Sequence, residues 1–75
     1  MEYDLELDLR GLNCPLPILR TKKTLATLSS GVVLKVLATD AGAPADFEQF
    51  CRQTGNVLLE STREGELFVM TIRRK

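Results

Sequence analysis

Apolar and polar residues alternate at the start of the chain, where every second residue from Tyr3 to Leu9 is apolar and those between are acidic. A period of two predicts a strand with one buried face, with Asp4, Glu6 and Asp8 on the open face. A second pattern runs from Val32 to Thr39, which is almost continuously apolar or β-branched and is broken only by Lys35. Such a run predicts a strand that is covered on much of both faces.

Two further strands are predicted near the end of the chain, over Asn56 to Thr62 and Leu67 to Arg73. The four residues between them, 63–66, include Gly65 and are typical of a hairpin turn in which glycine adopts a positive φ.

The longer segments between the predicted strands have apolar residues at helical spacing. The pattern predicts a first helix from Pro15 to about Leu28, ended by Ser29, Ser30 and Gly31. Pro44 opens a second predicted helix that ends near Thr54, with Gly55 just beyond it. One face of this second helix carries a stripe that we interpret as core, formed by Ala43, Phe47, Phe50, Cys51 and Thr54.

The resulting order, βαβαββ, predicts a single domain over residues 1–75 in the α/β (α+β) class. We expect a two-layer sandwich, with a mixed four-stranded sheet and both helices on one of its faces. The first two strands should be parallel and joined by a right-handed crossover. The residues just after the first strand, including Cys14, then lie at the carboxyl end of that strand, where open α/β sheets commonly place their chemistry.

Composition removes several function classes. The chain has no histidine, which excludes a Cys–His catalytic pair and histidine-containing zinc sites, and two cysteines cannot form a four-cysteine zinc site. The formal net charge is zero, which argues against a general nucleic-acid binder. Residues 1–4 lack the features of an export signal and no apolar run is long enough to span a membrane, so we expect reduced thiols in a cytoplasmic protein.

Cys14 is the strongest candidate for chemistry. With Pro15 at the first helical position and Pro17 at the third, Cys14 is predicted to be the N-cap, and the Leu16 N–H is the natural donor to its sulfur. The helix dipole would then favour the thiolate and lower the thiol pKa by about one unit or less. A small buried cysteine that happens to precede a helix is the alternative.

A family resemblance adds to this interpretation. A stretch ending in C-P-x-P and carrying a Gly-Leu pair resembles the TusA family of SirA-like sulfur carriers: Leu9-Arg10-Gly11-Leu12-Asn13-Cys14-Pro15-Leu16-Pro17. The resemblance extends over nearly the whole chain. It implies a sulfurtransferase that carries a persulfide on Cys14 and needs no cofactor beyond that covalent sulfur.

The resemblance also implies partners. A cysteine desulfurase or another sulfurtransferase would load Cys14, and an acceptor protein would take the sulfur in tRNA thiolation, cofactor synthesis or sulfur metabolism. Three positions depart from the family pattern. Ala41 replaces a common proline, Ala43 replaces a Ser or Thr that often caps the second helix, and Asn56 stands where a Gly-His pair often supplies a histidine. The missing hydroxyl at Ala43 should weaken that cap by roughly 1 kcal/mol.

Several residues keep alternative interpretations. Cys51 is either a buried small hydrophobe or the partner of Cys14 in a redox switch, and Arg10 is close enough in sequence to stabilise a Cys14 thiolate. The basic residues Arg20, Lys22 and Lys23 form either a solvated helix face or a docking surface for an acidic donor or tRNA, and Arg10 is a further candidate for partner docking. Direct nucleic-acid binding is not favoured.

The acidic residues around the start of the second predicted helix and the basic C-terminal residues are given structural roles. Asp40 and Asp46 are interpreted as loop and helix-dipole residues rather than an acid–base pair, and the tail 73–75 as a solubilising end. The rival function is a regulatory or partner-binding module that uses the same surface without sulfur chemistry.

Overall fold

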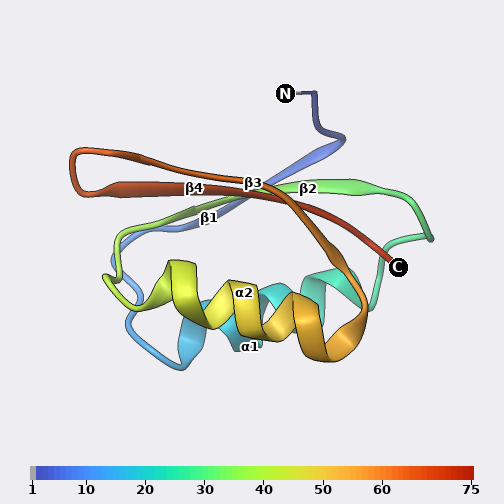
Figure 1. The fold of residues 1–75 in the computed structure, drawn as a ribbon, viewed down its shortest axis with the longest axis horizontal. Helices are drawn as coiled ribbons and strands as arrows, with labels where there is room; N and C mark the ends of the chain where they lie inside the picture. Colours follow the sequence, from blue (N-terminus) through green and yellow to red (C-terminus); the bar gives the residue numbers. More distant parts are fainter. Residues whose placement is uncertain (1) are drawn as a thin grey trace.

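The computed structural model describes residues 2–75, so Met1, the first residue of the predicted domain, lies outside the described residues. The elements follow the predicted order: β1 (Leu5–Leu9), α1 (Leu16–Leu25), β2 (Val33–Ala38), α2 (Ala43–Thr54), β3 (Val57–Glu64) and β4 (Leu67–Arg73). The four strands form one sheet in the order β1-β2-β4-β3, with β1 and β2 parallel and the other pairs antiparallel. Both helices cover the same face of the sheet (Figure 1), which confirms the predicted two-layer α+β fold.

The core lies between this sheet face and the helices. Alternate residues of β2 are fully buried, while Val33, Lys35 and Leu37 between them are half-buried, so only one face of the strand is completely covered. In β1, burial increases along the strand, from Leu5 at 42% exposed to Leu9 at 2%. The strand is therefore best anchored at its carboxyl end, where the candidate loop begins.

The first helix is shorter than predicted. It ends at Leu25 rather than near Leu28, because the chain tightens into i→i−3 turns in which Thr27 N–H donates to Thr24 O and Leu28 N–H donates to Leu25 O, at 3.0 and 3.1 Å. Tighter bonds of this kind are common where a helix ends. Leu28 still packs against the core, so its predicted burial is partly confirmed although its backbone is not helical.

The second helix begins one residue earlier than predicted. Gly42 is its N-cap, Ala43 is its first residue and is only 1% exposed, and Pro44 is its second. The expectation that residue 43 is the cap position, weakened by its missing hydroxyl, was therefore wrong, because Gly42 is the N-cap and Ala43 packs in the core. The predicted end is confirmed, since Gly55 has a φ of 85° and donates its N–H to Cys51 O at 2.9 Å.

The predicted stripe on α2 is buried at all of its positions except Thr54, which is exposed. Thr54 lies in the last turn of the helix, and its hydroxyl donates to Phe50 O at 2.8 Å.

The C-terminal residues have a structural role that a solubilising tail would not have. Arg74 donates from Nε to Leu25 O at 2.8 Å, and its backbone pairs with Gly31 and Val32. The Lys75 N–H donates to Asn56 Oδ1 at 2.8 Å. Asn56, a departure from the family pattern, therefore ties the end of the chain to the start of β3. Within residues 2–75, no helix has both the length and the apolarity needed to cross a membrane.

Candidate functional site

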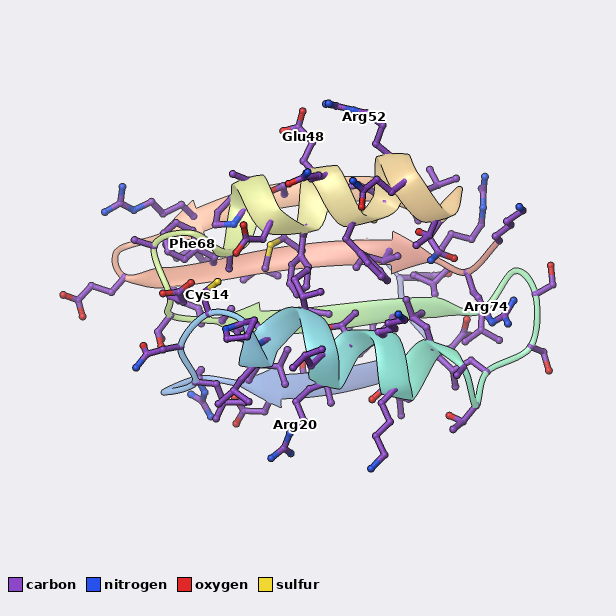
Figure 2. All side chains as sticks on the ribbon, turned by 90° about the horizontal axis from the view of Figure 1, so that it is seen from below. Cys14, Arg20, Glu48, Arg52, Phe68 and Arg74 are labelled. Atoms are coloured by element: carbon purple, nitrogen blue, oxygen red, sulfur yellow. The ribbon has the colours of Figure 1, made fainter. Side chains whose placement is uncertain are left out.

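Cys14 lies on the loop that connects β1 to α1, with an exposed thiol at one end of the molecule (Figure 2). Gly11 shapes this loop, since its φ of 83° lies in the left-handed region that favours glycine. The Gly11 N–H donates to Thr39 Oγ1 at 2.9 Å, and Leu12 N–H donates to Leu9 O at 3.2 Å. The loop is thereby attached to the carboxyl ends of both β1 and β2.

The start of α1 differs from the prediction. Its N-cap is Pro15, no side chain caps it, and Pro17 is its second residue. The Leu16 N–H donates to the backbone oxygen of Asn13 at 2.9 Å rather than to the Cys14 sulfur. A carbonyl oxygen is a stronger acceptor than sulfur, and the turn across residues 13–16 brings it to that amide. Cys14 is therefore not the N-cap, and the Cys14–Pro15 peptide bond is cis.

Beside Cys14 a groove of about 280 Å³ separates the two helices. Its α1 side is formed by Pro15 and Ile18, and its α2 side carries polar groups and one aromatic ring, from Asp46, Gln49, Phe50 and Gln53. The thiol therefore lies beside an open groove that is lined by both apolar and polar side chains.

Electrostatics at Cys14 oppose the expected acidity. The pKa of the Cys14 thiol is raised, first by partial desolvation, then by the charge of Asp46 and by hydrogen bonding to its carboxylate, and last by the charge of Asp40. Each effect disfavours a thiolate. The prediction of a lowered pKa was wrong because the sulfur is partly desolvated, does not accept from the first amide of the helix, and experiences the negative charges of Asp46 and Asp40.

Arg10 does not supply a compensating charge. Its guanidinium donates from Nε and Nη2 to the two carboxylate oxygens of Asp8, both at 2.9 Å. Arg10 is absent from the influences on the Cys14 pKa, so its expected stabilisation of a thiolate is not found.

The ion pair between Asp8 and Arg10 predicts how the stability of the fold depends on pH. Hydrogen bonds from Arg10, led by the side-chain bond, lower the pKa of Asp8 from 3.8 to about 2. A lowered folded-state pKa contributes stability above the unfolded value, and this is lost as the pH falls from about 4 to about 2. NMR titration of the Asp8 carboxyl carbon should show a midpoint near 2 in the native chain and near the ordinary value in Arg10→Ala. An unchanged midpoint in that variant would contradict the assignment.

The three basic residues of α1 do not form one surface. Arg20 and Lys23 are exposed beside the apolar side chains of Leu7, Leu16 and Leu19. Lys22 lies on another side of the helix, in a hollow shared with Arg74 and Lys75. A docking role for these residues stays a prediction, and if it holds, Arg20 and Lys23 act together without Lys22.

Cys51 fits the interpretation of a small core residue. It is 5% exposed, burial raises the pKa of its thiol, and it does not line the groove beside Cys14. Both cysteines are free thiols. The redox switch with Cys14 remains a prediction that no contact between the two thiols supports.

Several residues at the site were missed by the sequence analysis or given other roles there: Thr39, Asp40, Asp46, Gln49, Phe50 and Gln53. One signal was present, because Cys14 follows β1 and Thr39 and Asp40 follow β2. Parallel neighbouring strands bring such segments to the same edge of a sheet. The α2 residues had no comparable signal, since the packing angle of the two helices decides which side chains face Cys14. Among residues 2–75 no group of three or more potential metal ligands is found.

A two-layer α+β domain whose exposed cysteine precedes a proline-rich helix start defines a class of small thiol-bearing proteins. The family model described as "Sulfurtransferase TusA" matches residues 5–74, and the chain belongs to the TusA family. It is 58% identical over 73 residues to the sulfur carrier protein TusA of Allochromatium vinosum, covering 97% of this chain and 96% of that one. It is also 58% identical over 69 residues to a putative sulfur carrier protein of Neisseria meningitidis, covering 92% and 93% of the two chains.

A solved structure agrees with these relatives. The SirA-like protein of Desulfitobacterium hafniense superposes with a TM-score of 0.82 at 26% identity, covering 93% of this chain and 96% of that one. Family and relatives together support a sulfur carrier role, and a carrier has a sulfur donor and a sulfur acceptor as partners.

Proposed function

We propose that this chain carries sulfur as a persulfide on Cys14, taking it from a donor protein and delivering it to an acceptor protein. The observation that carries the proposal is the contrast between the two thiols. Cys14 is exposed beside an open groove on the loop with the family pattern, whereas Cys51 is buried in the core. Only a thiol that a second protein can reach can exchange sulfur with it.

The loading step is a displacement at sulfur. The Cys14 sulfur attacks the outer sulfur of a donor persulfide, R–S–SH, the donor S–S bond breaks, and the products are Cys14–S–SH and the donor thiol R–SH. The proton that leaves Cys14 is balanced by the proton taken up by the donor thiolate. Delivery repeats the step with the acceptor thiol as nucleophile, so neither step needs an external oxidant or reductant.

The partners proposed for this cycle are a cysteine desulfurase or another sulfurtransferase as donor and a second protein as acceptor. The acceptor would serve tRNA thiolation, cofactor synthesis or another branch of sulfur metabolism. We place the cycle in the cytosol, where thiols are kept reduced. The protein needs no bound cofactor in this proposal, because the transferred sulfur is the only group it holds.

Intact mass spectrometry tests the proposal. After incubation with a cysteine desulfurase and cysteine, the native chain should gain a mass of one sulfur atom that dithiothreitol removes. Cys14→Ser should lose this adduct completely, and Cys51→Ser, the matched control, should keep it. An adduct that persists in Cys14→Ser would contradict the proposal. No adduct on the native chain, combined with partner binding unaffected by Cys14→Ser, would favour a binding module without sulfur chemistry.

A further inference from the structure

Two carboxylates, Asp40 and Asp46, converge on the turn that starts α2. A Cβ placed on Gly42 would lie 3.3 Å from Asp40 Oδ2 and 3.7 Å from Asp46 Oδ2, so the two carboxylate groups lie near the same backbone position. Within residues 2–75, the salt bridges join Arg10 to Asp8, Lys35 to Glu6 and Arg52 to Glu48, and none includes Asp40 or Asp46. Both charges are therefore left without a neutralising cation in the described part of the chain.

The groove brings Asp46 and the thiol together. Cys14 lines one side and Asp46 the other, and the remaining polar side chains from α2, Gln49 and Gln53, are neutral. The α1 side offers only the apolar Pro15 and Ile18. The charged groups that act on Cys14 are thus Asp46 from α2 and Asp40 from the β2–α2 connection, and both are negative.

This arrangement is unusual for a reactive cysteine. The thiolate is the nucleophile in sulfur exchange, and reactive cysteines normally lie in electropositive surroundings. Here desolvation and then the charges of Asp46 and Asp40 raise the pKa of the Cys14 thiol, so the reactive thiolate is less populated than in an ordinary exposed cysteine. Activation of the Cys14 thiol therefore requires a positive charge in the groove, and none of the groove residues of this chain supplies one.

We propose that the negative charge of Asp46, which lines the groove with Cys14, disfavours the thiolate in the free carrier, and that a basic side chain of a sulfur-transfer partner promotes the thiolate by pairing with Asp46 in the groove. Asp46 acts as a positioning residue that favours retention of the proton on the Cys14 sulfur. Its negative charge favours a partner that carries a Lys or Arg beside its own reacting sulfur. The inference rests on the proposed function for its biological meaning. Its chemistry concerns only the free chain and is tested separately.

The first test is the pH profile of Cys14 alkylation by iodoacetamide, followed by intact mass. Asp46→Asn should move the midpoint downward by about half a unit to one unit, which is a rise of about three- to tenfold in the rate well below the midpoint. Asp40→Asn should move it less, because Asp40 acts only through its charge. Glu48→Gln is the matched control, since it removes the same charge from α2 at a residue that points away from Cys14 (Figure 2).

Folding is monitored in the same samples. Cys51 is buried, so a folded variant takes up one alkyl group, and a second group reports unfolding. If Asp46→Asn unfolds, Asp46→Ser replaces it as the variant without the carboxylate, and Asp40→Asn reports the separate effect of the second charge. A profile of the Asp46 variant that coincides with those of the native chain and Glu48→Gln would overturn the proposal.

The second test replaces the partner with small disulfides of different charge. Cystamine, which carries two ammonium groups, and bis(2-hydroxyethyl) disulfide, which is neutral, each form a mixed disulfide with Cys14. The Cys14 sulfur bonds to one probe sulfur, the probe S–S bond breaks, and the released thiolate takes up a proton. The ratio of the cystamine rate to the neutral rate should fall by about two- to fivefold in Asp46→Asn, and the probes' own reactivities cancel in this comparison.

If this rate ratio is unchanged in Asp46→Asn, the proposal that Asp46 favours a basic partner is wrong. These results are independent of sulfur loading, so failure of the desulfurase experiment with a shifted alkylation profile would reject the persulfide proposal and retain the role of Asp46. The reverse pair of results would reject the role of Asp46 and retain the persulfide proposal.

Discussion

Replacing Phe47 by alanine should lower the free energy of unfolding by about 3–5 kcal/mol, as for other large aromatic residues truncated in protein cores. Phe47 is fully buried, at 0% exposed, and belongs to the cluster that joins α2 to β2 and β4. At about 0.05–0.15 kcal/mol per residue, a chain of 75 residues has a total stability of about 4–11 kcal/mol. The loss is therefore a large part of the total stability, and at the lower end of that range the variant is partly or wholly unfolded at room temperature.

Urea unfolding followed by far-ultraviolet circular dichroism measures this loss. Leu19→Ala is the matched control, because Leu19 is a helical apolar residue that is 54% exposed, and its truncation should change the free energy by no more than about 0.5 kcal/mol. Equal losses in the two variants would contradict a core centred between the helices and the sheet.

The opposite effect is expected at Thr21. Its side chain is 0% exposed, and its hydroxyl oxygen is the buried side-chain polar atom without a hydrogen-bond partner among residues 2–75. A buried unsatisfied hydroxyl costs about 1–3 kcal/mol, and valine has nearly the same shape without that group. Thr21→Val should therefore raise the free energy of unfolding by about 1–2 kcal/mol.

The same urea measurement tests this gain. Thr24→Val is the control, because it makes the identical change one turn along α1 at a half-exposed residue and should stay within about 0.5 kcal/mol of the native chain. A loss of stability in Thr21→Val would mean that the hydroxyl has a partner in solution.

The elements were predictable from the sequence because strong local patterns and the packing of the fold agree. Three patterns each indicate a single local structure. The alternation from Tyr3 to Leu9 indicates a strand with one buried face, the apolar run of β2 indicates a largely covered strand, and Gly55 indicates the end of a helix. The parallel pairing of β1 and β2 then follows from the helix between them. The position of Cys14 at the carboxyl end of β1 needed only this topology.

The details at Cys14 were not predictable in this way. Whether the thiol or the Asn13 carbonyl receives the Leu16 amide depends on the backbone path over three residues, and composition does not determine that path. The approach of Asp46 depends on how α1 and α2 pack against each other. The wrong sign for the acidity of Cys14 followed from these two omissions, because helix-terminus electrostatics was considered without the neighbouring helix.

The strand order has a consequence for the completeness of the fold. β4 follows every other element along the chain and yet lies between β2 and β3 (Figure 1). A chain that stops before Leu67 would lack the middle of the sheet rather than its margin, and β3 would have no strand to pair with. The half-sheet left behind would expose the long edge of β2, which is a template for aggregation. The loop that carries Cys14 is therefore joined to a fully paired sheet only when β4 lies between β2 and β3.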